Sequence, residues 1–522
     1  MPVPFPSRLL LVLVTLLFAL PAAGQAKRPN VILILADDMG FSDVGCYGSE
    51  IPTPNIDRLA AGGFRLTQFY NNARCCPTRA SILTGLWSHQ AGIGHMVNDE
   101  HAPAYRGYLS ENCVTIAEVV KTAGYHPLMV GKWHIGEQHP HWPVDRGFEH
   151  YYGLVNGSNS YFRVDPAKTL ARDNEKTSLP PGSYLTDSFT ENALTYIDEY
   201  GKKPEPFFLY LAYTAPHWPL HAPKETIDQF RGKYASGWDA LRAARHEKQI
   251  ALGIVDPKWG ITPRDEKAKP WESVEDKELM GLKMAVYAAQ VAKLDEGVGR
   301  VMAKLKELGI EENTLVMFCA DNGGCAEAVN RGKPGAEAGT PDSFMSYGLP
   351  WANASNTPFR LYKHWDHEGG ISSPFIAYWP GVINPGQLDK TDFAHVVDLS
   401  ATVYDVAGAT YPKERNGHTI TPLEGISLLP LLKTGHREGH DAIYWEHEGN
   451  KAVRKGDWKL VSKKGGGWEL YNMVEDRTEL HDLAAKEPEK VDELRKLWRA
   501  WAKKCNVLDK GDAANAKKPK KA

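Results

Sequence analysis

Short, unbroken runs of apolar residues recur along the chain. The first covers residues 31–35 (VILIL), and similar runs lie at residues 207–212, 314–320 and 375–378. Runs of this length without polar interruption are typical of strands buried on both faces. Between them lie helical patterns, the clearest at residues 284–308, where apolar residues are three or four positions apart. The alternation predicts an α/β fold with a large mixed, mainly parallel sheet sandwiched by helices, whose ligands bind outside the carboxyl ends of the strands.

The pattern changes after about residue 430. Four strand-like pieces separated by Gly and Asp turns precede a final helical stretch: residues 442–446, 451–454, 458–462, 468–471 and 488–501. This pattern predicts a smaller C-terminal α+β subdomain, an antiparallel sheet plus a helix, over residues 431–507, packed on a large domain over residues 27–430. The Lys-rich remainder, residues 508–522, is poor in apolar residues and is expected to be disordered, with binding to an anionic surface as the alternative.

The first residues have the features of an export signal. Arg8 supplies a positive charge, residues 9–20 are apolar except for Thr15, and residues 22–26 offer small side chains for cleavage. This apolar run is too short to cross a bilayer about 30 Å thick, which requires about 20 residues. We therefore predict a signal peptide over residues 1–26 and an exported protein, periplasmic or secreted. A retained N-terminal anchor is the alternative.

Composition and charge exclude several classes of protein. The chain has 522 residues, of which 42% are hydrophobic and 24% charged, so a disordered or fibrous protein is excluded. The formal net charge is −3, and no overall basic field exists to hold nucleic acid or an anionic membrane surface. We expect no nucleic-acid partner and no stable membrane partner.

The cysteines direct attention to one segment. There are seven, an odd number and too few for a disulfide scaffold, and Cys75 and Cys76 are adjacent and awkward to bridge to each other. The segment resembles a helix start, because Pro77 suits the first turn and Gly85 suits the end. Cys75 would then lie at the positive end of the helix dipole, near Arg79, where a thiolate or a metal ligand is favoured. A buried Cys pair before a core helix is the alternative.

The same segment resembles a known signature. Cys75-x-Pro77-Thr78-Arg79, followed by Leu83-Thr84-Gly85, is similar to the signature of the type I sulfatases, in the alkaline phosphatase superfamily. Further landmarks of that family are matched in the expected order, over roughly residues 30–507: Lys132-Trp133-His134-Ile135-Gly136, Ala215-Pro216-His217, Ala320-Asp321-Asn322-Gly323, and Lys363 with Glu368-Gly369-Gly370. Residues 91–94 (AGIG) and 356–360 (NTPFR) make the resemblance closest to bacterial arylsulfatases.

The resemblance implies a formylglycine-dependent sulfatase that uses one Ca²⁺. In that family a maturation enzyme converts the first Cys of the signature, here Cys75, to formylglycine, whose aldehyde hydrate is the nucleophile. One oxygen of the hydrate attacks sulfur, and deprotonation of the other releases sulfate. Family members hold the Ca²⁺ at positions matching Asp37, Asp38, Asp321 and Asn322, completed by the hydrate at position 75. These four residues follow two predicted strands and offer the hard oxygen ligands that suit Ca²⁺.

Five further residues receive roles from the resemblance. Arg79 and Lys132 are expected to hold the oxygens of the hydrate, and Lys132 also to reach the sulfate. His134 resembles the base that removes the proton of the second hydroxyl. His217 and Lys363 resemble the pair that binds sulfate and donates a proton to the leaving oxygen.

The expected substrate is a sulfate monoester, either an aryl sulfate or a sulfated carbohydrate. The residues that select it lie in loops outside these motifs, and export favours polysaccharide fragments. Candidate pocket walls are Trp218, Tyr151, Tyr152, Asn156, Trp351 and residues 238–271. Other polar residues are expected to serve the fold: His364, His367 and His395 as structural or exposed groups, and Asp398 as a helix cap.

Two other functions remain open. A phosphonate or phosphate ester hydrolase of the same superfamily can share the modified Cys, although that group typically has Asp-His where this chain has Asp321-Asn322. A non-catalytic protein that binds sulfated glycans would keep the metal and the cationic residues but leave Cys75 unmodified. The complete set of expected catalytic residues favours the sulfatase.

Overall fold

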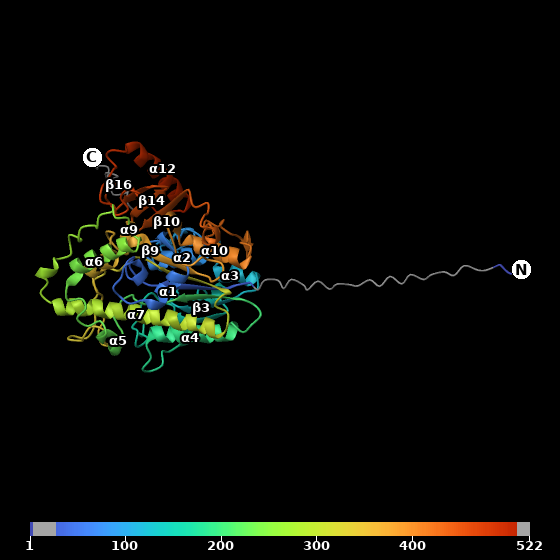
Figure 1. Ribbon diagram of the computed structural model, residues 1–522. Helices are drawn as coiled ribbons and strands as arrows, with labels where there is room; N and C mark the ends of the chain where they lie inside the picture. The colour runs from blue at the N-terminus through green and yellow to red at the C-terminus, as the bar shows by residue number, and fades with distance from the viewer. Residues whose placement is uncertain (4–27, 509–522) are drawn as a thin grey trace.

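The computed structural model describes residues 1–3 and 28–508 of the chain (Figure 1). The expected signal peptide (residues 1–26) and Lys-rich tail (residues 508–522) therefore lie almost wholly outside the described residues. Within the described ranges, no helix has both the length and the apolar character needed to cross a bilayer.

A ten-stranded mixed sheet forms the centre of the molecule. Its strands, in spatial order, are β10 (Gln387–His395), β2 (Phe64–Tyr70), β9 (Ser372–Tyr378), β8 (Thr314–Ala320), β1 (Asn30–Ala36), β7 (Phe207–Ala212), β3 (His126–Gly131), β4 (His150–Leu154), β5 (Leu170–Arg172) and β6 (Glu175–Thr177). The five strands from β8 to β4 run parallel, whereas β9 is antiparallel to both of its neighbours, β8 and β2. The predicted α/β fold is confirmed.

Strand β1 shows why the apolar runs are unbroken. Because successive side chains point to opposite faces of a sheet, Ile32 and Ile34 enter one hydrophobic core and Val31 and Leu33 enter the other. The first core is covered by α1 (Pro54–Gly62), α4 (Leu185–Tyr200) and α7 (Lys277–Glu307), and the second by α2 (Cys75–Thr84), α3 (Ile116–Thr122) and α10 (Val397–Ala407). Figure 1 shows the two helical layers on either side of the sheet.

Helix α7 begins earlier than its apolar pattern. Asp276 caps it by accepting a hydrogen bond from the Leu279 amide at 2.9 Å, so the helix includes a partly exposed first segment before residue 284.

The remaining elements are α5 (Lys224–Asp228), α6 (Gly237–Ala251), α8 (Leu349–Ser355), α9 (Glu368–Ile371), α11 (Leu429–Thr434), the short strands β11 (Glu414–Arg415) and β12 (His418–Thr419), and single 3₁₀ turns at Gly45–Tyr47, Val144–Arg146 and Trp271–Ser273.

The C-terminal part forms a second, antiparallel sheet. Its four strands lie in chain order, and a final helix packs on them: β13 (Ala442–His447), β14 (Asn450–Lys455), β15 (Trp458–Ser462), β16 (Trp468–Asn472) and α12 (Pro488–Lys504). Trp445, Leu460 and Trp498 are buried in the core between this sheet and α12. This is the α+β architecture predicted from the turn spacing.

A buried ionic cluster joins the two sheets. Lys459 of β15 lies 2.8 Å from Glu368 of α9 and 2.8 Å from Glu479, and Arg477 donates a hydrogen bond to the other oxygen of Glu368 at 3.0 Å. All four side chains are fully buried. Burial opposes the charge on Glu368, but Lys459 and Arg477 outweigh that effect and lower its pKa to about 2.

Replacing Lys459 by methionine should therefore destabilise the protein strongly. The variant removes the cation that Glu368 and Glu479 share in a buried site, where breaking an ion pair costs about 3–5 kcal/mol. Lys258→Met is the matched control, because Lys258 and Glu475 form an exposed pair at 3.0 Å, worth about 0–1 kcal/mol. Urea unfolding of both variants measures the difference. Equal losses in the two variants would show that the cluster does not hold the sheets together.

Candidate active site

Acidic residues from two neighbouring strands meet at one edge of the large sheet. Ala36 of β1 pairs with Ala320 of β8, so the residues that follow each strand emerge side by side. The Asp38 amide donates to Asp321 Oδ1 at 3.2 Å, and Asn322 Nδ2 donates to Asp38 Oδ1 at 2.7 Å. Asp38 has a φ of 62°, in the left-handed region that few residues other than glycine adopt.

The oxygens of this cluster fit a hard cation. Asp37 Oδ1, Asp38 Oδ2 and Asn322 Oδ1 are buried and, among the described residues, have no hydrogen-bond partner. Burial, together with the neighbouring Asp37 carboxylate, raises the pKa of Asp321 to about 8, and burial also raises the pKa of Asp37. Ionising these carboxylates together requires nearby positive charge, and carboxylate and amide oxygens are the ligands that Ca²⁺ prefers.

Two buried cations already face the carboxylates. Arg79 of α2 donates to Asp321 Oδ2 at 2.7 Å and to the Lys132 carbonyl at 2.9 Å. Lys132, which directly follows β3, donates to Asp37 Oδ2 at 2.6 Å. Both side chains are fully buried, so these ion pairs are shielded from solvent. Helix α2 is thereby fixed to the ends of three strands.

Cys75 is the first residue of α2, as the positions of Pro77 and Gly85 predict. Gly85 ends the helix in the left-handed region, with a φ of 68°. Cys75 Sγ lies 3.4 Å from His134 Nδ1, and Cys76 Sγ lies at the same distance from that atom. His134, like Asp38, has a left-handed backbone, with a φ of 57°.

The pKa values of the two thiols shift in opposite directions. A hydrogen bond from Cys76 lowers the pKa of Cys75 well below its ordinary value, and Lys132 and His134 act in the same direction against the effect of burial. Burial raises the pKa of Cys76 well above its ordinary value. Deprotonation is therefore favoured at Cys75 and disfavoured at Cys76. All seven cysteines are free, so the odd count does not mark any one of them.

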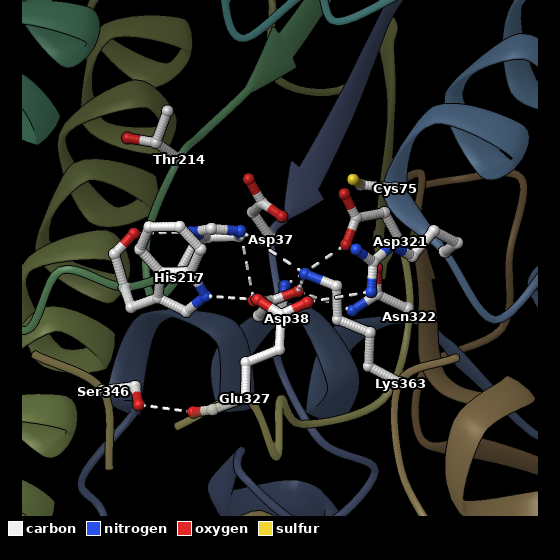
Figure 2. Close-up of polar contacts among 12 residues, drawn as sticks. Asp37, Asp38, Cys75, Thr214, His217, Asp321, Asn322, Glu327, Ser346 and Lys363 are labelled. Atoms are coloured by element: carbon white, nitrogen blue, oxygen red, sulfur yellow. Dashed lines mark hydrogen bonds and ion pairs between the residues drawn. The ribbon is translucent and has the colours of Figure 1, made fainter. Parts of the chain in front are cut away.

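His217 and Lys363 both contact the Asp38 carboxylate of the cluster (Figure 2). Lys363 Nζ lies 2.7 Å from Asp38 Oδ1 and 3.4 Å from His217 Nε2, which is itself 3.4 Å from Asp38 Oδ2. The Trp218 carbonyl, 2.6 Å from His217 Nδ1, accepts a hydrogen bond from that nitrogen and leaves Nε2 facing the cluster. Burial lowers the pKa of His217 to about 4, whereas the Asp38 carboxylate outweighs burial and raises the pKa of Lys363.

The structure thus brings every predicted site residue to one edge of the sheet. Lys363 lies in the segment before β9, and because β9 is antiparallel to β8, its amino end meets the carboxyl ends of β1 and β8. Sequence reasoning missed Arg74 and Glu327, which form an ion pair at 2.9 Å beside Cys75, with Glu327 also accepting from the Trp218 indole at 2.9 Å. Neither lies in a motif that could have identified it.

Most of the expected pocket walls belong to the core instead. Tyr151 and Trp351 are fully buried, and Trp238 and Trp271 pack edge-on against each other with ring centroids 4.8 Å apart, so these expectations were wrong. Trp218 is only partly buried and lies beside His217. A cavity of 870 Å³ lies along α4. Tyr152, one of the expected pocket walls, lines it, but none of the predicted catalytic or metal-binding residues does, so its size does not locate the chemistry.

Asp398 does not cap its helix. Val396 is the N-cap of α10, and the Asp398 carboxylate is instead the centre of a buried network, 2.6 Å from His440 Nε2 and 3.1 Å from Arg437 Nη2. Its role in the fold is still structural, as expected.

Comparison with known proteins agrees with this geometry. The sulfatase family model matches residues 29–409, and the model of the C-terminal region of N-sulphoglucosamine sulphohydrolase matches residues 359–504. An arylsulfatase of Klebsiella aerogenes is 36% identical over 80% of this chain and 94% of its own length. An uncharacterized sulfatase of Schizosaccharomyces pombe is 34% identical over 94% of this chain and 96% of its own length.

A solved structure extends the similarity to the whole fold. The crystal structure of Ps i-CgsB in complex with k-i-k-neocarrahexaose has a TM-score of 0.68 and 26% identity over 91% of this chain and 93% of its own. The family match covers most of the described residues, including both strand ends that carry the acidic cluster and the helix that begins at Cys75. The chain therefore belongs to the sulfatase family, as a type I sulfatase, and is a sulfuric ester hydrolase.

Proposed function

We propose that the chain hydrolyses sulfate monoesters through a formylglycine formed from Cys75, with one Ca²⁺ held by Asp37, Asp38, Asp321 and Asn322 and by the hydrate at position 75. The observation that carries this proposal is the set of three buried oxygens that accept no hydrogen bond from the described residues, beside a helix that begins at Cys75. The formylglycine hydrate would supply the attacking oxygen, and the bound ion would supply Lewis acidity.

The side chains around this centre hold the anion and move its protons. Arg79 and Lys132 stay charged and fixed by the carboxylates, so they hold the hydrate and sulfate oxygens without reorganising. His134, 3.4 Å from Cys75 and neutral because burial lowers its pKa to about 4, accepts the proton whose removal releases sulfate. The pair of Lys363 and His217 supplies the proton that the leaving oxygen needs. Lys363 is its protonated member, and Nε2 of His217, turned toward the site by the Trp218 carbonyl, lies 3.4 Å from Lys363 Nζ.

Removing the divalent ion should abolish most of the activity and some of the stability. Metal assistance contributes several kcal/mol to such reactions, so treatment with EGTA should lower kcat/KM by about 10²–10³-fold. Ca²⁺ should restore it, and Ca²⁺ at about 100 times its dissociation constant should stabilise the fold by about 2.7 kcal/mol, which raises the thermal midpoint. Neither effect would appear if the four oxygen-bearing residues held no ion.

The substrate is either an aryl sulfate or a sulfated oligosaccharide. Proteins similar to this chain include an arylsulfatase and an N-acetylgalactosamine-6-sulfatase, and Ps i-CgsB was crystallised with k-i-k-neocarrahexaose. Trp218 offers a partly exposed ring beside His217, which suits either an aryl ring or a sugar face. Turnover of a panel of sulfated oligosaccharides, measured beside a chromogenic aryl sulfate, distinguishes the two classes.

Two alternatives are tested by separate measurements. Faster turnover of an aryl phosphate than of the matching aryl sulfate would favour a phosphate or phosphonate ester hydrolase. A sulfated-glycan-binding protein would bind without turnover and keep a free thiol at Cys75 in a host that matures sulfatases. Asn322 has no charge and no imidazole, which favours the sulfatase over the phosphoesterase.

Export and maturation complete the proposal. The expected signal peptide would direct the chain to the periplasm or the medium, and the mature protein would begin near residue 27. A formylglycine-generating enzyme would act on Cys75 before the chain folds, because Cys75 is buried in the folded protein. Amino-terminal sequencing of the exported protein tests the first point.

A further inference from the structure

A second group of potential metal ligands lies close to the catalytic residues but is separate from them. His364 directly follows Lys363, and its amide donates to the Ala73 carbonyl at 2.7 Å. His447 and Glu448 lie at the turn between β13 and β14. The group therefore joins the C-terminal sheet to the segment that carries Lys363.

The spacing of these three side chains suits a small metal ion. His364 Nδ1 lies 3.0 Å from Glu448 Oε2, and His447 Nε2 lies 3.8 Å from Glu448 Oε1. One donor atom from each of the three residues lies within 4.8 Å of the other two. Ligand atoms on a tetrahedral Zn²⁺, with bonds of about 2.0–2.1 Å, are about 3.3 Å apart. The observed distances lie on both sides of that value.

His447 provides a second, independent indication of a ligand. Its side chain is fully buried, and neither ring nitrogen has a hydrogen-bond partner in the part of the chain that the structure describes. A buried polar atom without a partner is destabilising, and ring nitrogens are rarely left in this state. Burial also keeps the ring neutral by lowering its pKa, which is the form that binds metals.

The surroundings orient the carboxylate and leave a route for entry. His95 Nε2 lies 2.7 Å from Glu448 Oε1, and the His95 ring stacks on His447 with centroids 5.6 Å apart. Partners of this kind hold metal-binding side chains in position. His364 and Glu448 are about one-third exposed, so an ion can reach them from solvent. Arg74, whose charge acts on His447, is paired with Glu327 at 2.9 Å.

We propose that His364, His447 and Glu448 bind a divalent transition-metal ion such as Zn²⁺, at a site distinct from the oxygen cluster of Asp37 and Asp38. Two imidazoles and one carboxylate favour Zn²⁺ over Ca²⁺, because Ca²⁺ takes six to eight oxygen ligands. The bound ion would link the β13–β14 turn to the backbone beside Lys363. This inference does not depend on the proposed function.

Co²⁺ binding to the full-length, Ca²⁺-loaded protein, followed by visible absorption and calorimetry, tests the proposal. We expect one Co²⁺ per chain with visible d–d bands and no thiolate charge-transfer band in the near ultraviolet, and Zn²⁺ should displace it. His95→Ala should weaken binding about 10–100-fold. His364→Ala and His447→Ala should weaken it more.

The control and the contradicting results are equally specific. His418→Ala removes an imidazole from another surface pair, 3.1 Å from Glu111, and should bind Co²⁺ like the parent. If His447→Ala fails to fold, the Co²⁺ affinity of His364→Ala still tests the proposal, because the His364 side chain is partly exposed. Absence of binding, or unchanged affinity in His364→Ala, overturns the proposal. A thiolate band also overturns it, because that band would place the ion at Cys75, Cys76 and His134, whose donor atoms form another such group.

Discussion

Cys75→Ala should lose sulfate ester hydrolysis almost completely, by about 10⁴–10⁶-fold in kcat, the range seen when a catalytic nucleophile is removed. The reason is local: Cys75 is the side chain that begins α2, has the lowered pKa and lies 3.4 Å from His134. An alanine there can form no hydrate. The measurement is kcat for an aryl sulfate, with protein purified from a host whose own sulfatases are deleted.

Cys76→Ala is the matched control for this prediction. Cys76 is equally buried and lies as close to His134, but burial raises its pKa and keeps it a thiol. Its removal should leave kcat at the same order of magnitude. The assignment of the nucleophile is contradicted if the Cys76 variant loses activity and the Cys75 variant keeps it.

His217→Ala should lose activity in a way that depends on the leaving group. A group that protonates the leaving oxygen contributes about 10²–10⁴-fold when that oxygen is a poor leaving group. Nitrophenolate needs little protonation, so the loss should be small for nitrophenyl sulfate and large for an alkyl or sugar sulfate. The measurement is kcat for both substrates in parent and variant.

Lys363→Met should follow the same pattern, because Lys363 Nζ lies 3.4 Å from His217 Nε2. It should also weaken binding of both substrates, since a cation that faces sulfate is lost. Equal losses of kcat for good and poor leaving groups in both variants would contradict the role of this pair and leave them as binding residues only.

The elements that carry the site are short and locally encoded. The apolar run before Asp37 predicts β1. Pro77 in the first turn and Gly85 at the end predict the bounds of α2. The turns of the C-terminal sheet were predicted for the same reason, since Gly and Asp mark each reversal. Residue types at strand ends then identified the acidic cluster.

Features that depend on distant pairing could not be predicted this way. Lys363 was expected in the site only from the resemblance to the sulfatases, because its position depends on the antiparallel orientation of β9, which no local pattern reveals. Trp351 was expected in a pocket wall because its side chain is aromatic. In the structure its ring packs against the Trp238 ring in the core, with ring centroids 5.3 Å apart. Arg74 meets Glu327 across 253 positions, so their ion pair has no sequence signal.

The most direct test of the account relates conversion of Cys75 to activity in a single protein. Expression with increasing amounts of a formylglycine-generating enzyme gives samples in which the fraction of converted Cys75, read by peptide mass spectrometry, ranges from none to nearly all. The account predicts that kcat per chain rises in proportion to that fraction and reaches zero when every Cys75 is a thiol. Full activity in protein with an unmodified thiol at position 75 would contradict it.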